Sequence, residues 1–315
     1  MSATFNQTAY QICTRAMRQI GAIASGETPT ADMINDAYVA LNAMTKEWEA
    51  SGLHLWTETE GMLFVQPGQA QYLLGPGSAD HATTSPFVTT LATSALAGAT
   101  TLLLTSVGSI AVGDNIGIQL DSAGVFWATV AAVSGLTVTL SAGLPSMASA
   151  LEPIYSYPVA SQAPRPLRIL SLRRRTVSSA IDIPLIAISR LDYQNLPYKT
   201  QTGTVNQWFY DPQLTNGILS IWQTPVAENG TVLPFTFMRQ INDWSDAAQV
   251  GDFPQEWVNA ITLNLAVEIA PEYDVNPQKM PYLVEQASLK KQALMDWDRE
   301  PESLYFGCAL ERQFR

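Results

Sequence analysis

The stretch DFPQEWVNAITLNLAVEIAP, residues 252–271, carries the clearest helical signal of the chain and decides its fold. It opens with Asp252 as a candidate acidic N-cap and with a proline in the first turn, a pattern typical of helix starts. Apolar residues then recur four apart and share one face, at Trp257, Ile261, Leu265 and Ile269. Pro271 ends the predicted helix. Its apolar face must pack against other parts of the chain.

A second helix is predicted from about Pro277 to Asp298, after a short connection at residues 272–276. The short connection indicates that the two helices form an antiparallel hairpin. The expected apolar stripe of the second helix consists of Leu283, Ala287, Leu294 and Trp297. A hairpin alone cannot bury both stripes, so it needs further helices.

The N-terminal region supplies two such helices. The first runs over residues 9–23, where Gly21 is placed to weaken or end it and the apolar face is Tyr10, Cys13, Met17 and Ile20. The second follows a turn and cap at residues 28–32, stops near Gly52, and has the apolar face Met33, Ala37, Leu41, Met44 and Trp48. We therefore expect the N-terminal and C-terminal helix pairs to form one bundle, with the middle of the chain inserted into it.

The middle of the chain reads as β structure. Residues 55–65 and 71–74 are predicted strands joined by a Pro-Gly turn, and further strands are expected at 183–188, 206–210, 218–222 and 233–238. Successive strands without long helices between them favour an antiparallel sheet. Residues 87–157 contain no Lys or Arg and predict a small all-β module, with strands at 101–104, 115–120, 125–133 and 136–140.

The predicted fold class is therefore α+β, with a helical bundle, a central antiparallel β domain and an inserted all-β module. The expected segments are bundle helices at 1–52, a β segment at 53–86, the module at 87–157, the rest of the β domain at 158–251, the helical hairpin at 252–300 and an extended tail at 301–315.

Composition limits the classes of function. The formal net charge of −11 argues against a protein that wraps the outside of a nucleic acid, although it permits an acidic wall past which DNA slides. No apolar run is long enough for a membrane span, and the N-terminus lacks a signal-peptide pattern. Cys13 and Cys308 lie in different contexts, which disfavours a structural disulfide.

A search for catalytic and metal-binding patterns finds few candidates. Neither His54 nor His81 has Cys, His or carboxylate neighbours at metal-ligand spacing, and no nucleotide-binding or nucleophile motif is present. Glu58 and Glu60 are two residues apart on a predicted strand, so their side chains point to the same face. Two interpretations stay open: an acid/base pair, or two solvated surface residues. The sequence predicts no catalytic residue, no cofactor and no metal, and hence no enzyme.

One segment of this acidic chain is basic. Five arginines lie in residues 165–175, on a predicted strand whose Leu167 and Ile169 face the core, with Leu172 as a further candidate for that face. Two interpretations stay open: a surface that contacts an acidic partner or nucleic acid, and a solvated strand end paired with nearby carboxylates. The candidate partner-binding residues of this segment are Arg173, Arg174 and Arg175.

Several blocks, in this order, resemble the head-to-tail adaptor family of short-tailed bacteriophages, also called tail accessory factors or packaged-DNA stabilisation proteins. The blocks are Gly26-Glu27-Thr28-Pro29, Leu41-Asn42-Ala43-Met44 with Trp48, Ile183-Pro184-Leu185, Ser189-Arg190-Leu191-Asp192-Tyr193, Tyr210-Asp211-Pro212-Gln213, residues 252–257, residues 264–273 and residues 296–300. They cover both helical ends and the later β segment. Residues 87–157 depart from the family pattern, so the resemblance implies nothing about them.

The resemblance implies a virion structural protein. Members of the family dock as a ring of twelve copies under the phage portal, extend the DNA channel, help retain the packaged genome and support the remaining tail proteins. The implied partners are the portal protein, further copies of the chain, downstream tail proteins such as a nozzle, fibre or spike, and double-stranded DNA passing without sequence recognition. The implied location is the virion neck, with assembly in the host cytoplasm.

The tail at 301–315 is too short and mixed to fold by itself. We expect it to order on the portal or on a neighbouring copy, with the candidate contact residues Tyr305, Phe306, Arg312, Phe314 and Arg315. Two alternative functions remain: a virion-associated peptidoglycan hydrolase using Glu58 or Glu60, and carbohydrate binding by the module at 87–157.

Overall fold

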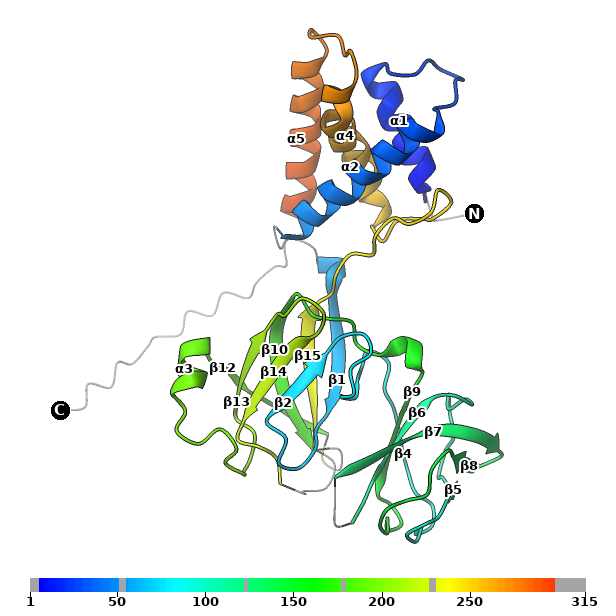
Figure 1. Ribbon diagram of the computed structural model, residues 1–315, viewed down its shortest axis with the longest axis vertical. Coiled ribbons are helices and arrows are strands. Elements are labelled where there is room, and N and C mark those ends of the chain that lie inside the picture. The colour runs from blue at the N-terminus through cyan, green and yellow to red at the C-terminus, as the bar shows by residue number, and fades with distance from the viewer. Residues whose placement is uncertain (1–5, 51–54, 122–123, 177–179, 227–230, 298–315) are drawn as a thin grey trace, which may run out of the picture. The chain divides into compact units, whose positions relative to one another are not determined.

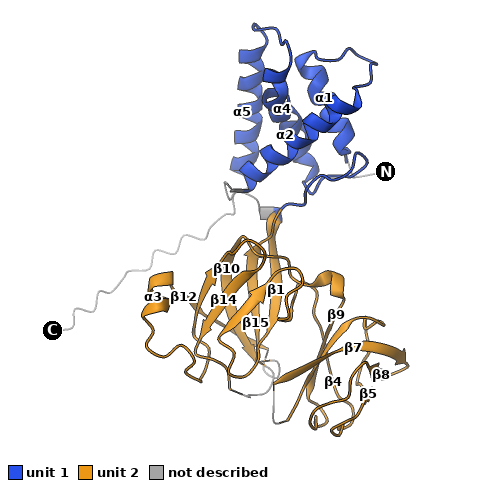
Figure 2. Ribbon diagram, viewed as in Figure 1, with its two compact units in different colours: residues 1–56, 241–315 blue, residues 57–240 orange. Residues whose placement is uncertain are grey.

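The computed structural model describes residues 6–50, 55–121, 124–176, 180–226 and 231–297. The chain folds into two compact units, one formed by residues 1–56 with 241–315 and the other by residues 57–240 (Figure 2). The first unit is helical and the second consists mainly of antiparallel sheets, as Figure 1 shows. The α+β fold class predicted from the sequence is confirmed.

Among the described residues of the helical unit, four α-helices contribute buried side chains to one hydrophobic core. The first helix begins after Thr8, whose side chain and Gln11 form a capping box, and it ends at Gly21, which adopts a left-handed φ of 84° that suits glycine. Thr30 caps the second helix by accepting the Met33 amide proton. The helices are α1 (Ala9–Ile20), α2 (Ala31–Ala50), α4 (Val258–Ile269) and α5 (Met280–Trp297).

Trp257 lies at the centre of this core and is fully buried. Its ring centroid is 5.9 Å from that of Trp48 on α2 and 5.0 Å from that of Trp56. The residues that recur every four positions after Trp257 along α4, namely Ile261, Leu265 and Ile269, are at most 1% exposed. Short 3-10 turns, Gln255–Trp257 and Ala270–Glu272, flank α4. The helix that the sequence predicts most clearly therefore supplies the centre of the unit.

Two details of the predicted hairpin are wrong. The sequence predicts Asp252 as the N-cap, but the residue at the N-cap of the 3-10 turn before α4 is Pro254, which makes no side-chain hydrogen bond there. Trp297 is 65% exposed, whereas Leu283 and Ala287 of the same predicted stripe are buried. The three-to-four spacing drifts around the helix over several turns, so a residue at the end of a long stripe leaves the packed face. Asn264 on α4 donates to the Ala287 carbonyl and ties the two helices together.

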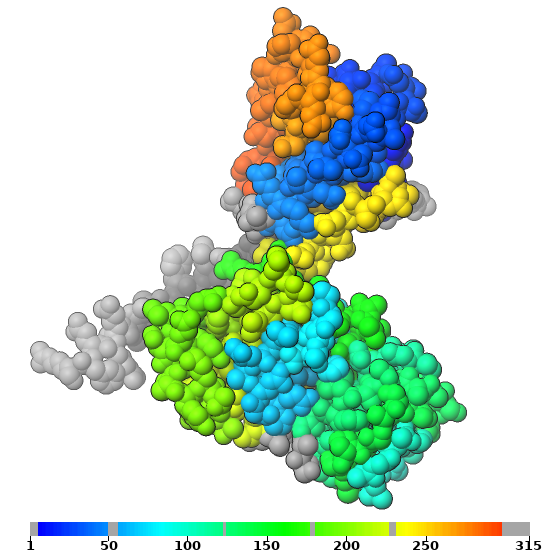
Figure 3. Space-filling model, viewed as in Figure 1, coloured from blue at the N-terminus to red at the C-terminus, as the bar shows by residue number. Residues whose placement is uncertain are grey.

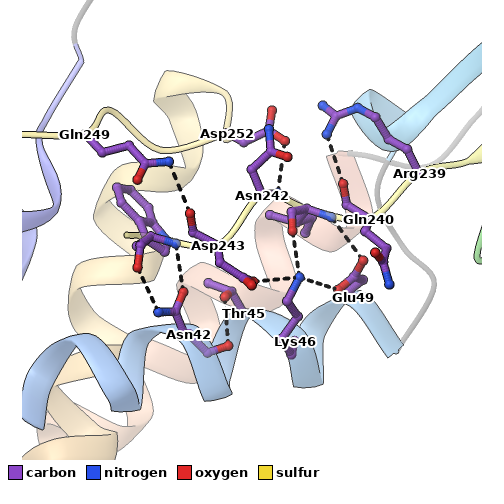
Figure 4. A network of polar contacts seen from close by, with 12 residues as sticks. Asn42, Thr45, Lys46, Glu49, Arg239, Gln240, Asn242, Asp243, Gln249 and Asp252 are labelled. Carbon is purple, nitrogen blue, oxygen red and sulfur yellow. Dashed lines mark hydrogen bonds and ion pairs between the residues drawn. The ribbon is translucent and has the colours of Figure 1, made fainter. Parts of the chain in front are cut away.

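Residues 241–251, which the sequence assigns to the β domain, belong to the helical unit. The side-chain amide of Asn42 on α2 makes two hydrogen bonds with the backbone of Trp244. Its oxygen accepts from the Trp244 backbone N–H at 2.9 Å, and its nitrogen donates to the Trp244 carbonyl at 3.0 Å. Lys46 donates to the Ile241 carbonyl and pairs with Asp243 at 2.9 Å and with Glu49 at 3.3 Å (Figure 4). These contacts fasten the segment to α2, and the sequence gives no local signal for them.

Two sheets of the second unit pack face to face. The first sheet has the order β11 (Ile181–Pro184), β10 (Arg168–Thr176), β15 (Thr231–Met238), β1 (Glu58–Phe64) and β3 (Ala82–Thr83). The second has the order β12 (Ile186–Ala187), β13 (Gln207–Asp211), β14 (Gly217–Trp222) and β2 (Gln71–Leu74), beside the short helix α3 (Arg190–Asn195). The predicted antiparallel pairing holds except between β12 and β13, which are parallel. β1 and β2 lie in different sheets, so the Pro-Gly turn between them does not close a hairpin.

The core between the two sheets is rich in aromatic side chains. Phe235 and Phe237 from β15 are fully buried together with residues of the opposite sheet such as Leu219 and Ile221. Gly61 on β1 leaves room for Phe235, because a Cβ at position 61 would lie 2.6 Å from the Phe235 ring. The packing of the Phe235 ring against β1 therefore favours a glycine at position 61.

The module at 87–157 is a six-stranded antiparallel sheet with its own apolar core. A bridge between Leu91 and Leu104, directly after the two outermost strands, joins the ends of the sheet and closes it on itself. Closure protects strand edges from pairing with other chains. In sheet order the strands are β4 (Phe87–Thr90), β9 (Pro153–Tyr157), β6 (Asn115–Gln119), β7 (Val125–Ser134), β8 (Thr137–Leu140) and β5 (Thr101–Leu103).

Among the described helices, none combines the length and the apolar character that crossing a membrane requires, in agreement with the sequence.

Candidate functional site

Four of the five arginines, from Arg168 to Arg175, lie on β10, where the sequence predicts a strand. Ile169 and Leu172 are buried in the core between the sheets, and Leu167 is half-buried. Because side chains alternate along a strand, Arg173 and Arg175 lie on the outer face of the sheet while Arg174 lies on the opposite face. The three arginines therefore do not form one continuous surface.

The two outer arginines pair with carboxylates of neighbouring strands. Arg173 contacts Glu60 on β1 at 3.0 Å. Arg175 binds Asp182 on β11 through two hydrogen bonds, of 2.5 and 2.7 Å. The guanidinium of Arg175 lowers the pKa of the Asp182 carboxyl through these bonds, and the carboxylate in turn raises the pKa of Arg175.

Arg174 is half-buried and makes no hydrogen bond or ion pair with any residue that the structure describes. Of the three predicted contact residues on β10, it is thus the one whose charge is not met by a local carboxylate. The remaining predicted contact residues, Tyr305, Phe306, Arg312, Phe314 and Arg315, lie outside the described residues.

The carboxylates considered for catalysis lie on the outer face of β1. Glu60 is 74% exposed as a side chain and is engaged by Arg173. Glu60 is therefore a solvated carboxylate held in a structural ion pair between β1 and β10. Across the described ranges, no group of three or more His, Cys, Asp or Glu side chains is placed to hold a metal ion.

The same outer face carries an aromatic cluster that joins the module to the central sheet. Phe64 of β1 is 2% exposed, and its ring centroid lies 5.0 Å from that of Trp127 and 4.8 Å from that of Tyr155. Tyr157 is stacked at 6.2 Å. Gln66 adds a hydrogen bond of 2.7 Å to the Val125 carbonyl. The module is therefore packed on the central sheet by apolar contacts.

This packing bears on the carbohydrate hypothesis. Proteins that bind sugars often stack them on exposed aromatic rings. Tyr155 and Tyr157 are 0% and 1% exposed, and Trp127 is half-buried against His81, so these rings are occupied by the chain itself.

His81 completes the cluster. Its ring stacks on Trp127 at a centroid distance of 3.8 Å, and its Nδ1 lies 2.7 Å from the Tyr157 hydroxyl. Burial lowers the pKa of His81 to about 4, and the nearby carboxylate of Asp80 opposes this shift only in part. His81 is thus neutral at neutral pH and serves the packing.

We expect the stability of this unit to fall as the pH drops from about 6.5 through 4. The ordinary pKa of histidine is about 6.5, so between pH 6.5 and 4 the His81 side chain is protonated in the unfolded chain but not in the folded protein. Protonation therefore favours the unfolded state in this range. After allowance for partial exposure, the loss should be roughly 1–2 kcal/mol. Urea midpoints across this range would measure it, and His81→Phe should show a shallower fall. An equal fall in the variant would contradict the role of His81.

Sequence reasoning missed this interface, since His81, Trp127 and Tyr157 are far apart in the chain and share no motif. It also did not connect Arg190 and Asp211, which form an ion pair of 2.5 Å while Arg190 lies over the Phe209 ring. Tyr193 stacks on the same ring at 5.9 Å.

Comparison of the chain with protein-family models finds no match, and comparison with curated proteins finds none either.

Proposed function

We propose that this chain is a structural protein of a short-tailed bacteriophage virion, a head-to-tail adaptor that docks as a ring under the portal. In this role it extends the DNA channel, helps retain the packaged genome and supports the remaining tail proteins. The proposed partners are the portal, further copies of the chain, downstream proteins such as a nozzle, fibre or spike, and DNA passing through. Ring closure requires two different surfaces of each copy to meet.

One observation carries the proposal: blocks of sequence that resemble the adaptor family, and that lie far apart in the chain, contact one another in pairs. Trp48 from an early block packs on Trp257 from a late one. Asn42, from the block around Leu41, holds the segment at Trp244 that leads into that late block. Arg190 and Asp211, from two β-region blocks, form an ion pair. The blocks thus meet in two clusters, one in the helical unit and one in the β unit. A chance likeness of isolated segments would not require the matching segments to contact one another.

Two further features support the proposal. We propose that α1, α2, α4 and α5 form the single bundle that the apolar faces of the predicted helices indicate, since all four contribute to one core. A net charge of −11 suits the wall of a channel through which DNA moves, because like charges prevent tight binding to phosphates. Among the three candidate arginines of β10, we propose Arg174 as the one that contacts an acidic surface of a neighbouring protein.

The test is to measure the mass and image symmetry of the purified protein, alone and after mixing with the portal ring encoded by the same genome. The expected result is a monomer or small oligomer that becomes a closed ring on the portal. A protein that ignores the portal would refute the adaptor role. Arg174→Gln should weaken ring formation, and Arg168→Gln, an exposed arginine on the same strand, is the matched control.

A further inference from the structure

Helix α5 is apolar on more than one side. It buries Leu283 and Ala287 in the helical core. Yet Tyr282, Val284, Leu289 and Trp297 are 67%, 45%, 55% and 65% exposed. A surface helix with one buried stripe normally presents polar residues on its other face. The second apolar face of α5 therefore indicates a contact beyond the four-helix core.

Two of these exposed residues, Val284 and Leu289, line an open groove at the N-terminal half of α5 (orange in Figures 1 and 3). Its apolar walls come from the α4–α5 connection and the first turns of α5: Val275, Met280, Pro281, Val284 and Leu289. Its volume of about 890 Å³ is in the range of sites that hold several side chains. An exposed apolar patch of this kind marks a binding surface.

We propose that the groove is the binding site for the chain's own C-terminal segment Leu304-Tyr305-Phe306, in the same molecule. This segment is a compact apolar triplet set between polar residues and Gly307. A leucine followed by two aromatic rings supplies the large apolar area that such a groove binds. The contact shields both surfaces in the free protein.

The length of the chain after α5 fits this assignment. Tyr305 follows Trp297 by eight residues, which span at most about 28 Å when extended. Leu289 and Val284 precede Trp297 by eight and thirteen residues, or about 12 and 20 Å along the helix. A segment that turns back after α5 therefore reaches the groove without strain.

Charge along this path is complementary. A chain running back from Trp297 carries Asp298, Arg299, Glu300 and Glu302 before the apolar triplet, a net charge of −2. On α5 the corresponding stretch, residues 290–296, carries Lys290, Lys291 and Asp296, a net charge of +1. The opposite net charges of residues 298–303 and of residues 290–296 favour a path in which the segment after α5 runs back along this helix.

The test uses a labelled peptide of residues 300–315 and four forms of the full chain. In the first variant Leu304, Tyr305 and Phe306 are all changed to Ser, which frees the groove. The second variant adds Leu289→Asp to these changes, and the third adds Val39→Asp, at a residue that is 64% exposed on α2. We expect saturable binding to the first and third forms, and at least tenfold weaker binding to the second and to the unchanged chain.

Several outcomes would overturn the proposal: no binding to the freed groove, equal binding to the Leu289→Asp form, or equal binding to the Val39→Asp and Leu289→Asp forms. Circular dichroism checks that both forms are folded. If Leu289→Asp unfolds the chain, Val284→Ser replaces it, because Val284 is also partly exposed.

A cross-link identifies which copy supplies the segment. In a Cys308→Ser background, Leu289→Cys and Ser303→Cys should form a disulfide within one chain, since such bonds need Cα atoms within about 7 Å. A disulfide-linked dimer would mean that a neighbouring copy occupies the groove and would overturn the intramolecular assignment. The inference does not depend on the adaptor role, because these experiments contain no portal and can succeed or fail independently of ring assembly.

Discussion

Replacing Trp257 by alanine should lower the free energy of unfolding of the helical unit by about 3–5 kcal/mol. Trp257 is fully buried between Trp48 and Trp56, and its removal leaves a cavity at the point where α2 and α4 meet. A core closed around such a large side chain cannot collapse fully to fill the space. Urea unfolding followed by the helical circular dichroism signal would measure the loss.

The matched control is Trp297→Ala, on the same predicted hairpin. Trp297 is 65% exposed, so the same chemical change should alter stability by less than about 0.5 kcal/mol. Equal losses in the two variants would contradict the arrangement of α4 and α5 described above. This pair also separates a residue that folds the unit from one that is available for contact with other molecules.

The helices were predictable because their signals are local. Thr8, Gly21 and Thr30 mark ends through hydrogen bonds or backbone angles within a few residues. The spacing of Ile261, Leu265 and Ile269 identifies a buried face without knowledge of its partner. Trp297 shows the limit, since spacing cannot tell where along a helix its covering partners end.

The pairing of the strands was not predictable in the same way. β1 and β2 follow each other in the chain but enter different sheets, and β1 pairs with β15, some 170 residues later. The sequence predicted the core-facing Ile169 of β10 but not the carboxylate partners of Arg173 and Arg175, because Glu60 and Asp182 are brought there by two other strands. Such contacts depend on topology, which a single sequence specifies only weakly.

The second large effect is expected for Phe64→Ala, which should cost about 3–5 kcal/mol at the junction of the module and the central sheet. Phe64 is 2% exposed and contacts three aromatic rings of the module. The module has a separate core, so we expect it to remain folded while its docking is lost. Covalent side-chain footprinting should then increase at Tyr155 and Tyr157, which are buried by docking, and change little at Val138, which lies in the module's own core.

Phe235→Ala is the control, because it makes the same change on the other face of the same sheet. Phe235 packs between the two central sheets and not against the module, so its loss should destabilise the central sheets as a whole and leave no selective effect at the module junction. If both variants gave the same footprinting pattern, the junction would not be an independent contact. A selective effect of Phe64→Ala would instead produce a protein with a folded but undocked module, and the ring-formation assay on that protein would show whether the docked position of the module is needed for assembly.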